Sequence, residues 1–373
     1  MNISAKTERT VREYICRMVL RSDPLSPEWN CENRIFRKQP KWNYIDSCMI
    51  HAAMMYRDEI PGITEYAVRF MNSYVDENGD IPTLRYSDFN LDNICGGREL
   101  LSLYRITGDE RYIRAAEGLF EGQLKNQPRL ECGSFWHKGI YPYQVWLDGV
   151  YMALPFMTEY GIFTGDNSCA ADALSQIGNI RRIMRDETTG LYYHGYCEKK
   201  DILWADRDTG LSANFWLRSN GWLCAGLADL YELTEDKACG EMLDELLKAL
   251  AAFADSNGML MQLPALPEQA GNYCETSGTL LYAYSAMKAS RMGVSGSSVY
   301  SAGRKALEAV TENYITNDGE VPVLSNICLM GGLGGDSSRD GSAGYYLSER
   351  IVENDAKGIA PYLMAAHEYL INS

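Results

Sequence analysis

The chain has 373 residues, of which 46% are hydrophobic and 23% are charged, and its formal net charge is −15. This composition excludes a disordered or fibrous chain and predicts a folded protein with a large buried core. The negative charge argues against nucleic acid and anionic membranes as partners, so an anionic ligand would need cationic side chains placed locally at its site.

The cysteines and the N-terminal residues predict a cytoplasmic protein. The 11 cysteines are an odd number, none forms a Cys-x-x-Cys pair, and several lie in helical patterns. This usage is typical of reduced thiols that serve as small apolar residues. Residues 1–10 are polar, unlike a secretory signal peptide. No apolar stretch reaches the roughly 18 residues that a membrane span needs.

Apolar residues recur at helical spacing along most of the chain. In the stretch 237–255, for example, Cys239, Met242, Leu243 and Leu246 follow one another at intervals of three and four, which is the stripe of an amphipathic helix. Twelve helices are predicted, over residues 4–21, 45–58, 62–76, 91–106, 109–125, 145–160, 167–185, 213–233, 237–255, 274–292, 297–314 and 356–371.

Short and long connections alternate between these helices. Short turns such as 107–109 and 164–166 place a glycine at the end of one helix and an aspartate at the start of the next. Several long connections open on a turn and continue into a strand-like run. The glycines of these turns recur every 50–70 residues or so, which indicates a repeated pair of helices.

The two sets of helices differ in polarity. The helices that follow long connections are apolar around most of their circumference and should be buried, whereas the others are amphipathic. This predicts an all-α fold over residues 1–373, a single (α/α)6 barrel with six inner and six outer helices. Short β-hairpins are expected in the loops at its mouth. The alternative is an open helical-repeat scaffold.

Polar and aromatic side chains collect where the inner helices are expected to begin. Trp146 and Asp148, like Trp216 and Arg218, are two residues apart, so in an extended helix entry both members of each pair point into the mouth. Helix N-termini favour an anion there. Aromatic rings beside carboxylates also suit a sugar, with rings against its apolar face and carboxylates on its hydroxyls. The other candidates at this mouth are Tyr44, Asp92, His137 and His194.

Four segments carry a resemblance to a known family. The run 133–152, with 215–222, 91–97 and 191–194, resembles the motifs of glycoside hydrolase family 105, the unsaturated rhamnogalacturonyl hydrolases. These enzymes are related to the family 88 unsaturated glucuronyl hydrolases. Segments near the C-terminus match as well, and the matches keep the family's order from about residue 40 to 365. The family's fold is an (α/α)6 barrel.

The resemblance implies a hydrolase that removes a 4,5-unsaturated uronic acid from the non-reducing end of rhamnogalacturonan-type pectin oligosaccharides. The C4=C5 double bond is hydrated, and the anomeric carbon is not attacked. Asp148 would be the acid and base, and Asp92, the second catalytic residue, would bind ring hydroxyls and help with the water. Arg218 and His194 would face the carboxylate or the reacting ring. The pocket would be shaped by Tyr44, His137, Trp146 and Trp216. A general acid needs a raised pKa, so apolar rings and a second carboxylate are expected to raise the pKa of Asp148.

Three other functions remain open from the sequence. An inverting glycosidase would use Asp148 as acid and Asp92 as base. A sugar epimerase would use His137 and His194, and a non-catalytic toroid would only bind sugar. Asp148 could also be no more than a helix cap.

The sequence predicts no metal site and no cofactor. The four histidines lack ligand spacing, and the glycines at 331–335 lack the βαβ context of a dinucleotide site, so this stretch is expected to be a flexible loop facing the substrate. The expected partner is an anionic oligosaccharide, and the protein is expected to be a monomer or homodimer.

Overall fold

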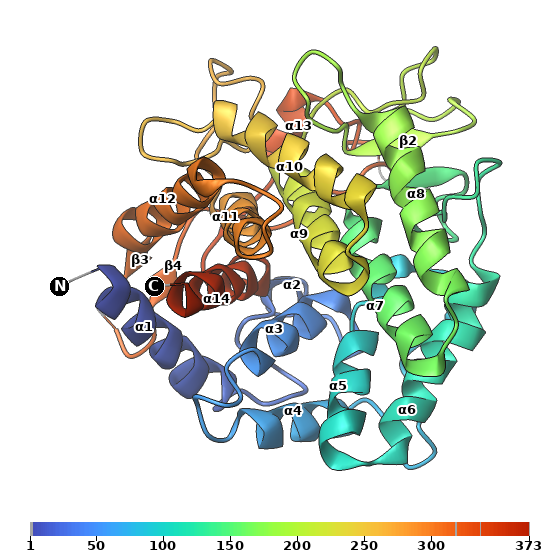
Figure 1. Ribbon diagram of the computed structural model, residues 1–373, viewed down its shortest axis with the longest axis vertical. Coiled ribbons are helices and arrows are strands. Elements are labelled where there is room, and N and C mark those ends of the chain that lie inside the picture. Colours follow the sequence, from blue (N-terminus) through green and yellow to red (C-terminus); the bar gives the residue numbers. More distant parts are fainter. Residues whose placement is uncertain (1–2, 318, 336, 373) are drawn as a thin grey trace.

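Two concentric rings of helices form the molecule (Figure 1). The computed structural model describes residues 3–317, 319–335 and 337–372. Within these ranges the inner ring consists of α3 (Tyr44–Met54), α5 (Gly97–Thr107), α7 (Asp148–Thr164), α9 (Leu217–Thr234), α11 (Thr276–Arg291) and α14 (Ala356–Ile371). The outer ring consists of α1 (Ile3–Glu13), α4 (Ile63–Asn72), α6 (Glu110–Glu117), α8 (Ser168–Met184), α10 (Lys237–Ala252) and α12 (Ser297–Asn313). The predicted (α/α)6 barrel is confirmed.

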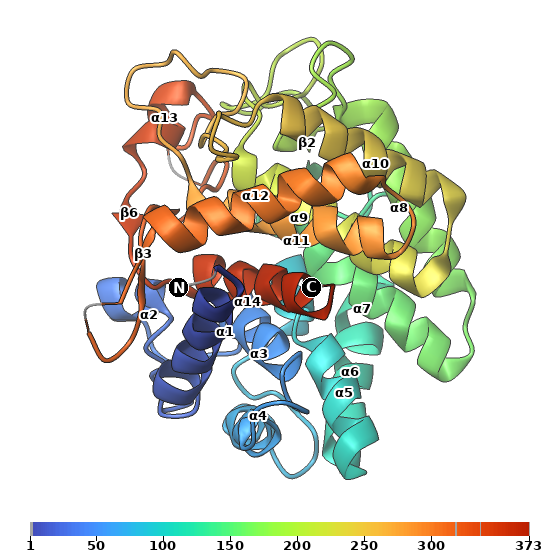
Figure 2. The same cartoon turned by 60° about the vertical axis from the view of Figure 1, so that its left-hand side comes forward.

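The inner ring is closed. Each inner helix contacts the next in chain order, and α14 returns to contact α3. Helix α1 packs against α12 and α14, so the first and last helices of the ring make its sixth hairpin (Figures 1 and 2). The open helical-repeat scaffold is therefore excluded.

Burial follows the polarity of the two sets of helices. In α9 and α11 nearly every residue is buried, whereas α10 buries the stripe that includes Met242 and Leu246. Small residues let the inner helices approach closely. A Cβ atom at Gly221 would lie 2.8 Å from the Cβ of Leu281, and one at Gly226 would lie 2.8 Å from a methyl group of Val150.

Several predicted helices are subdivided, and short ones were missed. The predicted helix 4–21 continues from α1 into a π-helical segment, η1 (Tyr14–Val19), and the 3-10 segment η3 (Leu91–Ile94) precedes α5. The predicted helix 109–125 continues from α6 into η4 (Gly118–Gln123) and η5 (Leu124–Asn126). Because six residues or fewer are too few to display helical periodicity, the sequence did not predict three short segments: α2 (Cys31–Phe36), η2 (Tyr86–Asp88) and α13 (Ala343–Ser348).

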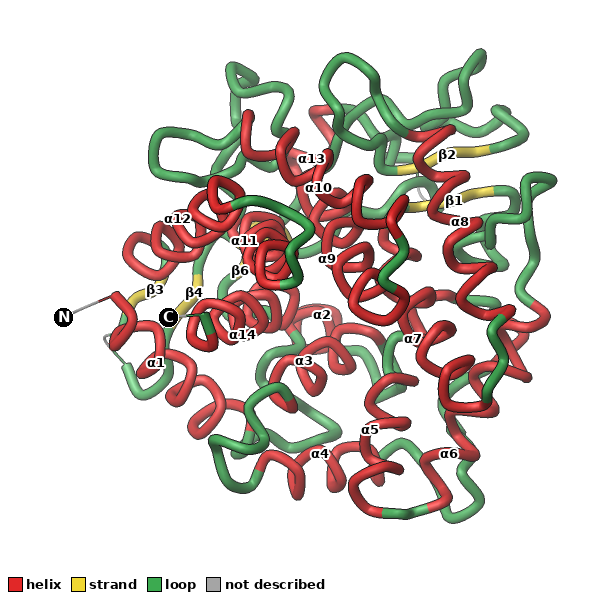
Figure 3. The backbone as a smooth tube through the Cα atoms, viewed as in Figure 1, coloured by secondary structure: helices red, strands yellow, loops and turns green. Residues whose placement is uncertain are grey.

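Short antiparallel strand pairs lie in the connections that lead into inner helices (Figure 3). The pairs are β1 (Gln144–Trp146) with β2 (Gly195–Cys197), β3 (Ile315–Thr316) with β4 (Val323–Leu324), and β5 (Ile327–Cys328) with β6 (Ile351–Val352). Two of the pairs join separate stretches of chain. The β1–β2 register sets Trp146 opposite Gly195, which brings the entry of α7 beside His194.

All eleven cysteines are free thiols. Within the described ranges no helix is long and apolar enough to cross a bilayer.

Candidate active site

A cavity of about 230 Å³ opens at the mouth of the barrel, where the inner helices begin. Seven of the eight predicted site residues line it: Tyr44, Asp92, His137, Trp146, Asp148, Trp216 and Arg218. Gly331 and Gly332 of the predicted substrate-facing loop line it too, as do residues that the sequence did not single out: Glu32, Lys38, Lys138, Tyr141, Met152, Met330 and Arg339. This set is called the mouth pocket below.

Helix entries position the central side chains of the mouth pocket. Asp148 is the first residue of α7 and is separated from β1 by Leu147 alone, while Trp216 is the N-cap of α9 and Arg218 its second helical residue. Tyr44 begins α3, and Asp92 lies in η3. All four side chains of the two Trp-Leu-Asp/Arg entries line the pocket, but Leu147 and Leu217 between them have helical backbone, so the extended entry that the spacing predicted is absent there.

Asp148 and His194 face each other. Oδ2 of Asp148 lies 3.3 Å from Nε2 of His194, and neither atom has a hydrogen-bond partner within the described part of the chain. Nδ1 of His194 shares a 2.7 Å hydrogen bond with the Tyr346 hydroxyl. His194 is fully buried and is not among the described residues that line the pocket. It therefore lies against Asp148 and Tyr346, and its contact with the substrate stays a prediction.

The electrostatic setting of Asp148 also differs from expectation. Burial raises the pKa of its carboxyl group, but His194, His137 and Arg218 together outweigh burial and hold this pKa below the ordinary value. The predicted increase in pKa was therefore wrong. The second carboxylate that was expected to cause it, Asp92, has its charge compensated by Lys138.

Asp92 is the acceptor of a small ionic cluster. Its carboxylate lies 2.5 Å from Nζ of Lys138 and 3.5 Å from Nε2 of His137. Burial lowers the pKa of His137 to about 4, so its imidazole is neutral near pH 7. Burial also disfavours the charged form of Lys138, but Asp92 outweighs this and raises the lysine's pKa. The carboxylate of Asp92 is thus an acceptor for the fixed side chains of Lys138 and His137.

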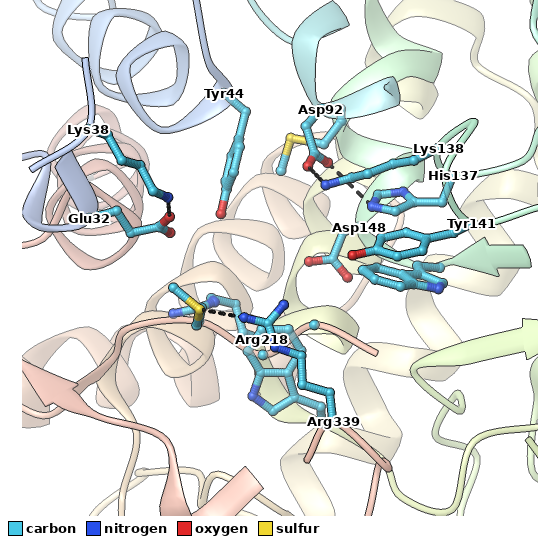
Figure 4. Close-up of a pocket in the computed structure, with 16 residues that line it drawn as sticks. Glu32, Lys38, Tyr44, Asp92, His137, Lys138, Tyr141, Asp148, Arg218 and Arg339 are labelled. Carbon is cyan, nitrogen blue, oxygen red and sulfur yellow. Dashed lines mark hydrogen bonds and ion pairs between the residues drawn. The ribbon is translucent and has the colours of Figure 1, made fainter. Parts of the chain in front are cut away.

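A second ionic cluster lies across the pocket, on the side opposite Asp92 (Figure 4). Glu32 of α2 lies 2.9 Å from Nζ of Lys38 and 3.0 Å from Nζ of Lys357. Burial raises the pKa of Glu32, but these two lysines outweigh it and bring the pKa to about 2. Glu32 is therefore ionised and already paired.

Arg218 is held rigidly at the pocket wall. Its guanidinium lies 4.7 Å from the Trp216 ring, and Nη1 donates to the Cys328 carbonyl and, over 3.2 Å, to the Ser277 hydroxyl. Trp216 in turn donates from Nε1 to Gln262 over 3.1 Å. A Cβ atom at Gly331 would come within 2.6 Å of this indole, so only glycine lets the loop pack there.

The pocket carries more positive than negative charge. Four cationic side chains line it, Lys38, Lys138, Arg218 and Arg339, against three carboxylates, Glu32, Asp92 and Asp148. This local excess stands against a chain charge of −15. A buried site with this balance favours an anionic ligand.

Aromatic rings form one wall of the mouth pocket. The Trp146 ring stacks with His137 at 4.5 Å and with Tyr141 at 4.9 Å between centroids. Its Nε1 donates to Gln144 over 3.1 Å. Each ring is held by a neighbour, so the wall is formed before any ligand arrives.

Sequence reasoning missed four of the seven charged residues of the pocket. Lys138 carried a signal, because it directly follows His137 inside the 133–152 motif. Glu32 lies in the short helix α2, and Lys38 follows that helix. Arg339 lies in an irregular loop, so helical periodicity could not reveal any of these three residues. The glycines at 331 and 332 line the pocket, which confirms that this loop faces it. The described residues contain no group of three or more His, Cys, Asp or Glu that could hold a metal ion.

Comparisons with known proteins assign the family. The sequence model of Glycosyl Hydrolase Family 88 matches residues 24–372. A 24.9 kDa protein in the picA locus of Rhizobium radiobacter is 38% identical over 231 residues, which cover 59% of this chain and 99% of that protein. The unsaturated rhamnogalacturonyl hydrolase YesR of Bacillus subtilis is 27% identical over 241 residues, which cover 61% of this chain and 65% of that protein.

Solved structures agree with this assignment. A family 105 glycoside hydrolase from C. acetobutylicum is 29% identical, covers 98% of both chains and has a TM-score of 0.87. An unsaturated glucuronyl hydrolase specific for heparin shares the fold, with a TM-score of 0.74 at 15% identity, and the match covers 99% of this chain and 97% of that one. Since the family match spans nearly the whole chain, the protein is a glycoside hydrolase that belongs to family 88 and resembles family 105 in structure.

Proposed function

We propose that the protein removes a 4,5-unsaturated uronic acid from the non-reducing end of rhamnogalacturonan-type oligosaccharides by hydrating the C4=C5 double bond. The observation that carries this proposal is the state of Asp148. Of the three carboxylates in the described mouth pocket, Glu32 and Asp92 are paired with lysines, whereas the ion-pair contact of Asp148 is with the histidine His194. Asp148 is therefore the carboxyl group that is free to exchange a proton with a substrate.

The charge of the pocket supports a uronate substrate. Arg218 presents a planar guanidinium, which suits the two oxygens of a carboxylate, and Lys138 and Lys38 add positive charge on either side. The Trp146 wall offers an apolar surface to the flat, unsaturated ring. Asp92, fixed by Lys138, can accept hydrogen bonds from ring hydroxyls.

The reaction proceeds by proton transfer and addition of water. Asp148 gives its proton to C4, and the positive charge that develops at C5 is shared with the ring oxygen. Water adds its oxygen to C5 and returns a proton to Asp148. The resulting hemiketal opens to a ketone at C5, and the former ring oxygen becomes a hydroxyl group on C1. The hemiacetal thus formed at C1 collapses to an aldehyde, which breaks the glycosidic bond and releases the next sugar as an alcohol. A positioned acid contributes about 10²–10⁴-fold to such a reaction.

Asp148 must take up a proton before it can act as the acid, and substrate binding must raise its pKa for this to happen. The pKa of Asp148 is lowered in the structure, so near neutral pH the group is ionised. A bound uronate brings a negative charge close to Asp148 and displaces water, and both effects favour the protonated carboxyl. Asp148 is thus protonated in the complex with the substrate.

The alternatives fit the described geometry less well. An epimerase would need two histidines against the sugar, but His194 is fully buried against Asp148. An inverting glycosidase would need Asp92 as a base that activates water, but Lys138 at 2.5 Å holds its charge. The free thiols of the chain suit a reducing compartment, and we propose that the enzyme acts in the cytoplasm.

Isotopic labelling tests the mechanism. An unsaturated uronyl disaccharide is incubated with the enzyme in deuterated, ¹⁸O-labelled water, and loss of the double bond is followed by ultraviolet absorbance. We expect deuterium at C4 and heavy oxygen at C5 of the released keto acid. The matched saturated uronide should not react. Heavy oxygen at C1, or turnover of the saturated sugar, would show conventional glycoside hydrolysis instead.

A further inference from the structure

Glu275 is a buried carboxylate that the proposed reaction does not use. It is fully buried at the start of α11, and it is not among the described residues that line the mouth pocket. Taking a carboxylate out of water is costly unless its charge is compensated by hydrogen bonds or an opposite charge. The partners of Glu275 therefore indicate what the residue does.

The carboxylate of Glu275 accepts hydrogen bonds from two separate parts of the chain. Oε1 accepts from the amide and the hydroxyl of Ser277, over 3.1 and 2.7 Å, and Oε2 accepts from the amide of Gly278 over 2.7 Å. Oε1 also accepts from the amide of Cys328 in β5 over 3.0 Å. The first set caps α11, whereas the last bond ties the start of this helix to β5.

Capping alone does not explain a glutamate at this position. Helix N-caps are usually Ser, Thr, Asp or Asn, whose short side chains reach the first amides of the helix. The inner helices α3 and α14 follow this rule, with Asn43 and Asp355 as their N-caps. Glu275 is longer by one methylene, and its carboxylate spans the distance from α11 to β5.

The two residues that Glu275 ties together are the hydrogen-bond partners of Arg218. Nη1 of Arg218 donates to the Ser277 hydroxyl over 3.2 Å and to the Cys328 carbonyl. Because the hydroxyl of Ser277 donates its hydrogen to Glu275, its oxygen is left to accept from the guanidinium. Because the amide of Cys328 is held by the same carboxylate, the backbone that carries the accepting carbonyl is held as well.

This arrangement leaves one end of the guanidinium for a ligand. The hydrogen bonds that Arg218 makes to described residues start from Nη1, and the residue lines the mouth pocket, so Nε and Nη2 are available to a carboxylate. A free arginine side chain has many rotamers and loses this freedom when it binds. Holding Arg218 in place beforehand lowers this entropic cost and favours binding.

We propose that Glu275 is a positioning residue of the active site, which fixes the guanidinium of Arg218 through Ser277 and Cys328 and thereby sets the affinity for the carboxylate of the unsaturated uronate. This inference rests on the proposed function, because it takes a uronate as the ligand of Arg218. Glu275 itself touches neither the substrate nor the reacting atoms. Its loss should therefore raise KM and change kcat little.

Two variants separate positioning from capping. Glu275→Asp keeps a residue type that caps helices well, but its side chain is one methylene too short to hold α11 and Cys328 together. Ser277→Ala removes the hydroxyl between Glu275 and Arg218 and keeps the carboxylate. We expect each variant to lower kcat/KM for an unsaturated uronyl disaccharide by about 3- to 10-fold, through KM, in initial-rate kinetics.

A double-mutant cycle tests whether the effect passes through Arg218. Arg218→Met removes the guanidinium and keeps an unbranched side chain. In the Arg218→Met background, Glu275→Asp and Ser277→Ala should each lower kcat/KM by less than about twofold. Effects that simply multiply with that of Arg218→Met would show that Glu275 acts independently of the guanidinium, and the inference would be overturned.

Asp236→Ala is the matched control for the loss of a helix cap. Asp236 is the N-cap of the outer helix α10 and accepts from the Cys239 amide over 2.9 Å. This variant should lower the urea midpoint and leave KM unchanged. If Glu275→Asp does not fold, Ser277→Ala decides the question alone.

The possible outcomes distinguish this inference from the proposed function. An unchanged KM in either folded variant would reduce Glu275 to a helix cap and overturn its positioning role, while the proposed function would stand. No turnover of any unsaturated uronide by the natural chain would reject the proposed function and the role of Glu275 together.

Discussion

The two ends of the inner helices use buried charge in opposite ways. At the mouth, Asp148 and His194 face each other with atoms that lack hydrogen-bond partners in the described chain. At the far end, Asp229 accepts from Tyr284 at 2.6 Å, from Lys288 at 2.7 Å and from Arg98 at 2.6 Å. Asp229 follows Arg218 by eleven residues on α9, which is about 16 Å along the helix.

This difference distinguishes buried charges that stabilise the fold from buried charges that are available for the reaction. Burial raises the pKa of Asp229, but Lys288 and Arg98 outweigh it and hold the pKa well below its ordinary value, so the far cluster is fully compensated. Glu232, Arg291 and Glu368 extend it across three helices. A buried polar atom without a partner is unfavourable, so the mouth sacrifices stability that the far cluster retains. The first atoms to examine for chemistry are therefore those that the fold leaves unpaired.

Breaking the far cluster should have the largest effect, and it should be an effect on stability. Asp229→Asn leaves Lys288 and Arg98 buried with less compensation, and we expect the free energy of unfolding to fall by about 3–5 kcal/mol. Because its pKa is lowered in the folded state, Asp229 stabilises the fold above its ordinary pKa and loses this effect as the pH falls. Urea unfolding at several pH values measures both.

The matched control is Asp58→Asn, whose side chain is 81% exposed, and it should change stability by less than about 0.5 kcal/mol. A loss below about 1 kcal/mol in Asp229→Asn would mean that the far cluster does not hold the helices together.

Removing the carboxylate at the mouth should affect activity more than stability. Asp148→Asn cannot donate a proton to C4, so we expect kcat to fall by at least about 10²–10³-fold with a smaller change in KM. Because the lowered pKa of Asp148 means that its ionised form stabilises the fold near neutral pH, the urea midpoint should fall, but by less than in Asp229→Asn. Retention of a tenth of the activity would show that another group is the acid.

Arg218→Lys tests whether the mouth recognises a planar carboxylate. A lysine keeps the charge but loses the fork geometry and the hydrogen bond to Ser277. We expect KM for an unsaturated uronide to rise by about tenfold, equivalent to one charged hydrogen bond. An unchanged KM in initial-rate kinetics would indicate that another cation holds the carboxylate, and Arg339→Lys would then be the variant to examine.

His194→Gln should produce the smallest change, a shift in pH dependence. His194 contributes to lowering the pKa of Asp148, so its removal should raise that pKa. The enzyme needs protonated Asp148, and kcat/KM falls as the pH rises through the pKa of the free enzyme. The falling limb should therefore move to higher pH in the variant. His51→Gln is the control, because Nδ1 of His51 lies 2.5 Å from Glu99 and the pair does not line the mouth pocket. This variant should leave the falling limb of the pH profile in place.

The same contrast explains what the sequence could predict. Helical periodicity located the twelve helices of the barrel, because each has a face or circumference that must be buried. The two Trp-Leu-Asp/Arg entries located Asp148 and Arg218, because a helix start fixes where its first side chains point. Periodicity carries no information on short or irregular segments, so Lys38 and Arg339 were missed. Nor could the sequence tell on which side of Asp148 the side chain of His194 would lie.

Because the first and last helices close the ring, the active site can be completed only late in translation. The amide of Ala356 donates to the Trp29 carbonyl over 2.9 Å, and Lys357 reaches Glu32. The hydroxyl that supports His194 belongs to Tyr346. A ribosome releases these late residues after it has already made Asp148, Arg218 and most of the barrel. The nascent chain therefore holds an unfinished site, and we expect no enzyme activity until the last helix has emerged and docked.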